Sequence, residues 1–155
     1  MKKTSASDVM SPNVKSVGAD WSIDRLVTFL TDNAITGAPV VADGGEPIGV
    51  VSLTDVARSG TTAEHAREQP HAFYRQGEAL FDRTDMKGMH LETESSVTVR
   101  DIMTPMVFAV EEATPVQEIA EMMVTGRIHR VFVKRGARMV GIITSMDLLP
   151  LVRDM

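Results

Sequence analysis

Two short segments of the chain place a hydroxyl residue three positions before a carboxylate. Both follow the pattern Gly-x-x-Ser/Thr-x-x-Asp, with Ser52 and Asp55 in the first copy and Thr144 and Asp147 in the second. Each pair falls at a predicted helix start, where free N–H groups and the helix dipole favour a phosphate group. The carboxylate adds strong hydrogen-bond acceptors for ligand hydroxyl groups. The alternative is a purely structural N-cap, which is the commoner use of such an Asp.

The two patterns close two copies of one longer segment. Asp8-Val9-Met10-Ser11-Pro12 returns as Asp101-Ile102-Met103-Thr104-Pro105, an offset of 93 residues (8 to 101) that becomes 92 (55 to 147) after a one-residue deletion. Most matched positions in between are apolar. They include Val14 with Val107, Val17 with Val110, Ile35 with Ile128 and Val40 with Val133. Two such units are expected to pack together, and the seam between them is a common place for a ligand.

Each repeat is predicted to form a β-α-β-β-α unit. Runs rich in β-branched residues at 14–17 and 107–110 indicate a first strand, and apolar residues at i, i+3, i+4 and i+7 indicate the helix that follows. Thr114 and Pro115 suit the N-cap and the first turn of that helix in the second repeat. Two apolar strands then flank a turn, and a second helix begins close to each closing Asp. The predicted fold class is α/β (α+β), with small sheets covered by helices.

The composition is that of an ordinary globular protein. The chain has 155 residues, of which 43% are apolar and 24% are charged. Its net charge of −5 argues against non-specific binding to a polyanion such as duplex DNA. The absence of cysteine excludes disulfides, thiolate catalysis and Cys-based metal sites. The N-terminus lacks an apolar signal core, and no apolar run approaches the ~18 residues of a membrane span, so we predict a cytoplasmic protein.

Basic residues crowd into one stretch of the second repeat. They are Arg127, Arg130, Lys134, Arg135 and Arg138. A solvated edge strand and turn is the favoured interpretation. Local attraction of a phosphate group is the alternative.

A polar insert separates the repeats. We divide the chain into a first repeat at 1–58, an insert at 59–98 and a second repeat at 99–155. A connection this long is unusual in a compact domain, and part of it is predicted to be helical. Its apolar residues could form a partner or dimer surface, or could simply cap an exposed edge of the body. These residues are Phe73, Tyr74, Leu80 and Phe81, while the insert histidines His65, His71 and His90 lack a metal-ligand spacing, so no metal site is predicted.

Several motifs resemble those of the CBS-domain pair, also called a Bateman module. They are the Asp-Val-Met-Ser-Pro and Asp-Ile-Met-Thr-Pro starts, Gly-Ala-Pro-Val-Val at 37–41, His-Arg-Val-Phe-Val at 129–133 and the two closing patterns. The resemblance covers approximately 7–58 and 99–152, and it suggests a stand-alone pair. Two departures fall in the second repeat, where Phe132 replaces the family's usual Pro and Lys134 its usual acidic residue.

The resemblance implies two repeats related by pseudo-twofold symmetry, with two clefts. In many family members these clefts bind adenosine-containing ligands: AMP, ADP, ATP, NAD or S-adenosylmethionine. Such a molecule would be a regulatory ligand, so no cofactor is required. The resemblance also implies a homodimer and control of an unidentified partner protein, with no part for nucleic acid or for a membrane.

The resemblance further assigns residues to each cleft, because the Asp of one repeat usually closes the cleft whose wall belongs to the other. A carboxylate can accept hydrogen bonds from both ribose hydroxyls. The first cleft would combine Ser52, Thr54 and Asp55 with Ala109, Ile128, His129 and Arg130. The second cleft would combine Thr144 and Asp147 with Ser16, Ile35, Thr36 and Ala38. His129 and Arg130 make the first cleft cationic, so a phosphorylated ligand is expected to prefer it.

Two other functions compete with an adenosine-binding regulatory module. One is a structural homodimerisation module with vestigial clefts, which the departures at Phe132 and Lys134 favour. The other is an enzyme. The chain has no nucleophile elbow, Walker loop or metal-ligand cluster, and no base or nucleophile stands near the closing Asp residues in sequence. No catalytic residue is therefore predicted.

Overall fold

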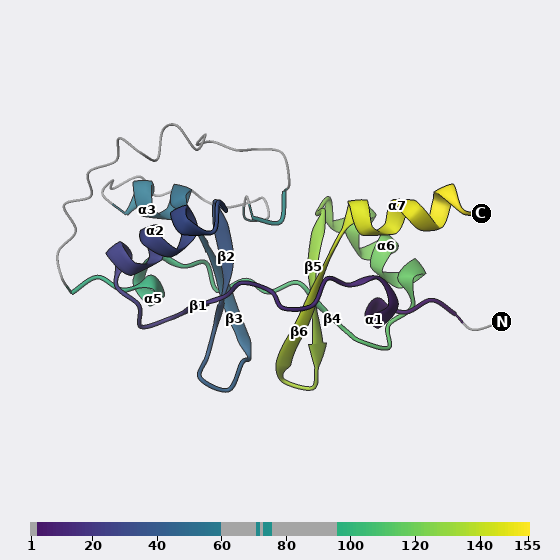
Figure 1. Cartoon of the computed structure of the whole chain (residues 1–155), viewed down its shortest axis with the longest axis horizontal. Helices are drawn as coiled ribbons and strands as arrows, with labels where there is room; N and C mark the ends of the chain where they lie inside the picture. The colour runs from purple at the N-terminus through teal and green to yellow at the C-terminus, as the bar shows by residue number, and fades with distance from the viewer. Residues whose placement is uncertain (1–2, 60–70, 72, 76–95) are drawn as a thin grey trace.

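Each repeat folds into a small sheet with helices packed against it (Figure 1). The computed structural model describes residues 3–59, 71, 73–75 and 96–155. The first repeat comprises α1 (Ala6–Val9), β1 (Val17–Gly18), α2 (Ile23–Asp32), β2 (Gly37–Val41), β3 (Pro47–Ser52) and α3 (Leu53–Arg58). The second comprises α5 (Val99–Ile102), β4 (Ala109–Glu111), α6 (Val116–Gly126), β5 (Arg130–Arg135), β6 (Arg138–Thr144) and α7 (Ser145–Arg153). The mixed α/β class and the order β-α-β-β-α are confirmed in both repeats.

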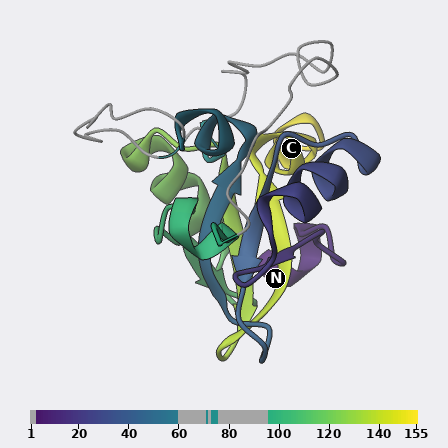
Figure 2. The same cartoon turned by 90° about the vertical axis from the view of Figure 1, so that its left-hand side faces the viewer.

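The two sheets have the same topology. In the first, β1 pairs parallel to β2 and β2 pairs antiparallel to β3, and in the second β4, β5 and β6 repeat this order. The parallel pairs need a crossover, and α2 and α6 supply it. The hairpins β2–β3 and β5–β6 turn at the same end of the molecule (Figure 2). The two closing motifs lie at the C-terminal ends of β3 and β6, and therefore at the end of the molecule away from the hairpin turns.

The start of each repeat packs on the other repeat. We call residues 5–12 and 98–105 the leading segments; each contains a short helix, α1 or α5, that was not predicted. Ser11 and Ile142 exchange two backbone hydrogen bonds of 2.9 and 3.0 Å, and Thr104 and Val50 exchange two of 2.9 Å. The repeats are thus tied together by reciprocal backbone pairing as well as by side chains.

This crossing gives a physical reason for the glycine of each closing motif. A Cβ atom on Gly49 would lie 2.6 Å from the carbonyl oxygen of Thr104. A Cβ atom on Gly141 would lie 2.5 Å from the sulfur of Met10. Glycine is required at position 49, where a second backbone approaches this closely, whereas the neighbour of Gly141 is a flexible side chain. The motif glycines therefore serve the contact between repeats.

The leading segments also explain two corrections to the predicted elements. The first strands start later than predicted, because residues 11–14 are drawn toward the other repeat and only Val17 and Gly18 pair with β2. The predicted N-cap at Thr114 is wrong: α6 begins at Val116 with Pro115 in the N-cap position and no side-chain cap. The carbonyl of Thr114 instead accepts a 2.8 Å hydrogen bond from the N–H of Ala6 in the first leading segment.

The described part of the chain contains no helix that is both long and apolar enough to cross a bilayer. The buried side chains form two clusters, each centred on one repeat and completed by residues of the other, such as Val50 in the second cluster and Val99 in the first. The first cluster includes Ile23, Leu26, Leu30 and Val40, and the second includes Ile119, Ile128, Phe132 and Ile143. The second cluster also takes in Phe73 and Tyr74 from the insert.

Candidate functional site

The start of α7, where the second cleft is predicted, carries a half-buried carboxylate. The Asp147 Oδ2 atom accepts hydrogen bonds from the N–H of Thr144 at 2.8 Å and from its hydroxyl at 3.2 Å, which makes a capping box. The Asp147 Oδ1 atom has no hydrogen-bond partner among the described residues. Asp147 is half-buried, as are Thr144 and Ser145. The carboxylate is therefore held in one orientation with an acceptor oxygen left for a ligand.

The start of α3, where the first cleft is predicted, has the same capping box in a different environment. The Asp55 Oδ2 atom accepts hydrogen bonds from the N–H of Ser52 at 2.8 Å and from its hydroxyl at 3.3 Å. Asp55 is only 3% exposed, however, and its Oδ2 atom also lies 2.9 Å from the Nε2 atom of His71. The histidine is 8% exposed. An insert residue thus contacts the carboxylate that was expected to hold a ribose.

Two aromatic residues of the insert fill the space between Asp55 and the second repeat. Phe73 stacks on Phe132, with ring centroids 5.7 Å apart and an interplanar angle of 22°. The guanidinium of Arg130 lies 5.1 Å from the Phe73 ring centroid, within the range of a cation–π contact. A Cβ atom on Gly37 would lie 3.2 Å from Phe73. Phe73 therefore touches both repeats at once.

Tyr74 anchors the insert to the second repeat. Its carbonyl accepts a 2.8 Å hydrogen bond from the N–H of His129. Its hydroxyl donates to the carbonyl of Met106 at 2.7 Å and accepts from the N–H of Phe108 at 3.3 Å. The side chain is fully buried, and this burial raises the pKa of the Tyr74 phenol well above its usual value. Of the two interpretations of Phe73 and Tyr74, packing against the body of the protein is the one that the structure supports, because Phe73 is 8% exposed and Tyr74 is fully buried.

The other predicted first-cleft residues fall into different environments. His129 and Arg130 contact the insert residues, and Ile128 is buried in the core of the second repeat. Ala109 pairs with Phe132 across β4 and β5. Thr54 is half-buried in the first turn of α3. Burial lowers the pKa of Arg130, whose Nε atom is buried and has no hydrogen-bond partner among the described residues.

Among the described residues, no hydrogen bond joins Thr144 or Asp147 to the four first-repeat residues predicted for the second cleft. Ala38 is buried, Ser16 and Ile35 are half-buried, and Thr36 is exposed. The carbonyl of Thr36 accepts a 3.0 Å hydrogen bond from the N–H of Leu53 at the start of α3. The pairing of Thr144 and Asp147 with these four residues stays a prediction.

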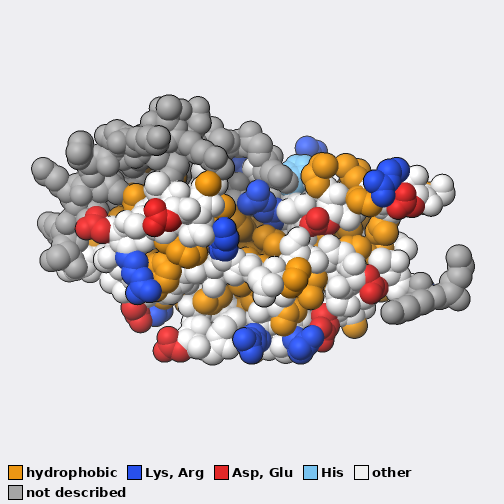
Figure 3. Space-filling view, in the orientation of Figure 1, with side chains coloured by type: hydrophobic (Ala, Val, Ile, Leu, Met, Phe, Trp, Pro, Cys, Tyr) orange, Lys and Arg blue, Asp and Glu red, His pale blue; other side chains and the backbone are white. Residues whose placement is uncertain are grey.

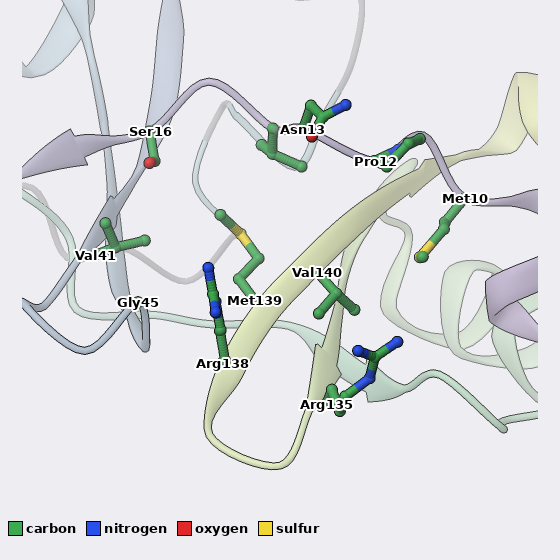
Figure 4. Close-up of a pocket in the computed structure, with 11 residues that line it drawn as sticks. Met10, Pro12, Asn13, Ser16, Val41, Gly45, Arg135, Arg138, Met139 and Val140 are labelled. Atoms are coloured by element: carbon green, nitrogen blue, oxygen red, sulfur yellow. The ribbon is translucent and has the colours of Figure 1, made fainter.

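A further cavity lies between the two hairpins and was not predicted (Figure 4). Its volume is about 550 Å³, and the first leading segment crosses over it. Its lining comprises Met10, Pro12, Asn13, Val14, Ser16, Val41, Gly45, Arg135, Arg138, Met139 and Val140. Sequence reasoning missed it because the crossing of the leading segment creates it.

The basic stretch of the second repeat has several separate roles. Arg135 makes two 2.9 Å hydrogen bonds to the Glu112 carboxylate, which lower the pKa of Glu112 and raise that of Arg135. Arg138 is exposed at the start of β6 and faces the cavity between the hairpins. The Arg130 guanidinium instead lies over the Phe73 ring. The described residues contain no group of three or more His, Asp or Glu side chains that could hold a metal ion.

Comparison with protein families identifies the class of the protein. The model of the CBS domain matches residues 6–61 and 99–154. The chain therefore belongs to the CBS-domain family and contains a pair of these domains. The two matched ranges follow the two repeats closely and leave residues 62–98 of the insert uncovered.

Curated relatives are 24–29% identical to this chain over the aligned residues. The CBS domain-containing protein CBSX2 of Arabidopsis thaliana chloroplasts is 24% identical over 140 residues, which is 88% of this chain and 58% of the relative. The uncharacterised protein MJ1225 of Methanocaldococcus jannaschii is 29% identical over 146 residues, 94% of this chain and 41% of the relative. The chain spans between a third and somewhat over half the length of these relatives.

Solved structures support the same fold. The CBS-domain pair of MJ0100 in complex with 5-methylthioadenosine and S-adenosyl-L-methionine matches with a TM-score of 0.62 and 22% identity, over 99% of this chain and 98% of that chain. CBSX2 in complex with AMP matches with a TM-score of 0.65 and 21% identity, over 97% of each chain. The CBS domain of a membrane protein from Sphaerobacter thermophilus matches with a TM-score of 0.66 and 26% identity, over 96% of this chain and 88% of that chain.

Proposed function

We propose that this CBS-domain pair is a non-catalytic regulatory module that binds an adenosine-containing ligand in the second cleft and signals to a partner protein. The observation that carries the proposal is the difference in burial and hydrogen bonding between the Asp147 and Asp55 carboxylates. Asp147 is half-buried and keeps its Oδ1 atom unpaired among the described residues, whereas Asp55 is buried against His71. This assignment revises the expectation that a phosphorylated ligand prefers the first cleft.

The chemistry of the second cleft suits a nucleoside. The two ribose hydroxyls can donate hydrogen bonds to the Asp147 carboxylate, and charge-assisted bonds of this kind contribute on the order of 1.5–3 kcal/mol each. The capping box already fixes the orientation of the carboxylate, so little conformational entropy is lost when the ligand binds. The apolar surface for the base would come from Ile35, which is half-buried, since Ala38 is only 1% exposed.

The class of ligand is supported by the complexes of similar structures with AMP, 5-methylthioadenosine and S-adenosyl-L-methionine. The residues proposed for the second cleft include no Lys or Arg. A ligand with little phosphate charge, such as AMP or S-adenosylmethionine, is therefore expected to bind more tightly than ATP. Arg130 and Arg135 of the second repeat already contact other groups, the Phe73 ring and the Glu112 carboxylate.

The test compares Asp147→Ala with Asp101→Ala. Asp101 forms the same capping box with Thr98 at the start of α5, with a 2.8 Å hydrogen bond to its Oδ2 atom, but it is exposed and belongs to no predicted cleft. Both changes remove one N-cap interaction, and each is expected to cost about 0.5–2 kcal/mol of stability. Only Asp147→Ala should also remove ligand binding.

The measurement is thermal unfolding with and without AMP, ADP, ATP, NAD and S-adenosylmethionine. A ligand present at about 100 times its Kd should stabilise wild type and Asp101→Ala by roughly 2.7 kcal/mol, and should leave Asp147→Ala unchanged. Equal stabilisation of Asp147→Ala would refute the second cleft as the site. No stabilisation of wild type by any of the five would favour the alternative function.

The alternative function is a structural homodimerisation module. An apolar face on the second repeat indicates that dimerisation could accompany ligand binding as an additional role. Val124 on α6 is 75% exposed, and Met146, Leu149 and Val152 on α7 are 61%, 52% and 65% exposed. Hydrophobic side chains gather at this end of the molecule in Figure 3. A twofold contact between α6–α7 faces of two copies would bury them, so we include a homodimer in the proposed function.

A further inference from the structure

The first cleft is filled by the chain itself. We call His71, Phe73 and Tyr74 the plug residues, because they lie between Asp55 of the first repeat and the strands of the second. None of the three is more than 8% exposed. They contact three of the residues expected to bind ligand there, namely Asp55, His129 and Arg130.

We propose that the plug residues are an intramolecular ligand of the first cleft, which an adenosine-containing ligand must displace in order to bind there. The plug residues would thus determine which of the two clefts is open to ligand. The inference rests on the proposed function for the class of ligand, but it concerns the other cleft.

The contact between His71 and Asp55 replaces a ribose contact. The N–H of Phe73 donates a 3.0 Å hydrogen bond to the Nδ1 atom of His71, so Nδ1 is an acceptor and the proton is on Nε2. The Nε2–H group then donates to the Oδ2 atom of Asp55 at 2.9 Å. A ribose hydroxyl is also a donor, and it would compete for the same carboxylate.

The Phe73 ring replaces a base. It lies on the Phe132 ring in a stacked arrangement, beneath the Arg130 guanidinium and against Gly37. A purine is a flat ring of comparable thickness, and stacking on Phe132 would serve either ring equally well. Phe132 is the residue that stands where the family usually has Pro, so this departure suits the plug.

One group in the cleft gains less from the plug than from a ligand. The Nε atom of Arg130 is buried and has no hydrogen-bond partner among the described residues, and the aromatic ring beneath it supplies no acceptor oxygen. A phosphate oxygen would supply one. A phosphorylated nucleoside therefore has an advantage over the plug that adenosine lacks, and this difference makes exchange between plug and ligand possible.

The binding test uses AMP and a chain in which the second cleft has been disabled by Asp147→Ala. Phe73→Ala and His71→Ala are added separately to this background, and Phe29→Ala serves as the matched control. Phe29 makes a comparable aromatic contact, with its ring centroid 5.3 Å from that of Trp21, but it lies on α2 outside the first cleft. Isothermal titration calorimetry gives the affinity of each folded variant.

We expect each plug variant, Phe73→Ala or His71→Ala, to bind AMP at least about tenfold more tightly than the Asp147→Ala parent. The reason is that only molecules with an open cleft can bind, so the apparent Kd equals the intrinsic Kd divided by the fraction of molecules whose cleft is open. Phe29→Ala should leave the affinity unchanged. If neither plug variant binds AMP more tightly than the parent, the inference is refuted. His71→Ala removes the hydrogen bonds of the imidazole with Asp55 and with the N–H of Phe73 but leaves the aromatic packing, so it keeps the test valid if Phe73→Ala does not fold.

A second readout uses the chain with its plug intact. The protein has a single tyrosine, Tyr74, so labelling with 3-fluorotyrosine yields one ¹⁹F resonance that reports on the plug. Saturating AMP in the Asp147→Ala chain should move this resonance toward the position of unfolded chain. If the resonance does not move when AMP saturates the first cleft, the proposal that AMP displaces the plug residues is refuted.

The outcomes separate this inference from the proposed function. If wild type binds AMP through Asp147 but the plug variants gain nothing, only the inference fails. If Asp147→Ala does not weaken binding but the plug variants strengthen it, only the assignment to the second cleft fails.

Discussion

At the scale of single residues, one hydroxyl–carboxylate pair serves different purposes in different places. The same capping box occurs at the starts of four helices, α1, α3, α5 and α7. At α1 and α5 it stabilises a helix end at the surface. At α7 it also orients the Asp147 carboxylate, and at α3 it places Asp55 against His71. The environment of the carboxylate, and not the pair itself, distinguishes a binding residue from a cap.

Tyr74→Phe tests the anchoring hydroxyl. The change removes the hydrogen bond to the carbonyl of Met106, so we expect a loss of about 1 kcal/mol in the free energy of unfolding at pH 8. Burial raises the pKa of the folded-state phenol, and the unfolded-state phenol ionises near pH 10. The contribution of the Tyr74 hydroxyl is therefore complete below about pH 10 and is lost as the pH rises further.

Urea unfolding of wild type and Tyr74→Phe at pH 8 and at about pH 10.5 measures this effect. The difference in stability between the two proteins should shrink at the higher pH, because the variant has no phenol to ionise. Since Tyr74 is the only tyrosine, no other phenol contributes to the difference. A difference that grows with pH would show that the hydroxyl is not buried as the structure has it.

At the scale of elements, the leading segments decide how the repeats fit together. Each one leaves its own sheet and pairs with the last strand of the other repeat, Ser11 with Ile142 and Thr104 with Val50. The first strand of each sheet is short as a consequence. This exchange also makes the cavity between the hairpins and places glycine in both closing motifs.

Gly49→Ala is expected to destabilise the protein by about 2 kcal/mol or more. The new Cβ would meet the Thr104 carbonyl oxygen at 2.6 Å, so the backbone of one segment must shift and the paired hydrogen bonds with Val50 must lengthen. Gly141→Ala should cost less, since its close contact is the flexible side chain of Met10. Urea unfolding at neutral pH measures the loss of stability in each variant and shows which loss is larger.

Gly44→Ala is the matched control for this pair. A Cβ on Gly44 has no atom within 4 Å, so the change should alter stability by no more than about 1 kcal/mol in either direction. If Gly49→Ala were as well tolerated as Gly44→Ala, the close crossing of the second leading segment would be refuted.

At the scale of the whole molecule, the two repeats have the same fold but different surface residues. The first cleft is filled by insert residues, and the exposed apolar face belongs to the second repeat. The first-repeat positions that correspond to Val124, Met146 and Leu149 are Thr31, Thr54 and Ala57, which offer little apolar surface. The two clefts are thus not equivalent for a ligand, and the two repeats are not equivalent for a second copy of the chain.

Leu149→Glu tests the proposed homodimer. A charge at the centre of the α6–α7 face would be desolvated in the contact, so we expect the dimer dissociation constant to rise by about tenfold or more. Sedimentation velocity over a range of concentrations measures it. Thr28→Glu, which adds the same charge at an exposed position of α2, should leave the association unchanged. A wild-type chain that stays monomeric throughout would refute the homodimer.

The sequence by itself determined the duplication, the fold class and the family. These depend on local patterns: apolar periodicity, turn residues and the hydroxyl–carboxylate pairs recur in the same order in both repeats. The predicted helices α2, α3, α6 and α7 were found for that reason. The insert residues Leu80 and Phe81, and the predicted helical part of the insert, lie outside the described residues.

Only the tertiary structure decided how the repeats and the insert meet. His71 reaches Asp55 across 16 positions, and Tyr74 reaches Met106 across 32. Neither spacing has a local signature, because contacts this distant depend on the path of the chain between them and on which buried groups still need a partner. Thr114 failed as an N-cap for the same reason, since its carbonyl bonds a segment more than a hundred residues earlier, at Ala6. Local pattern specifies the units, and long-range hydrogen bonding and burial determine which residues close the cleft between them.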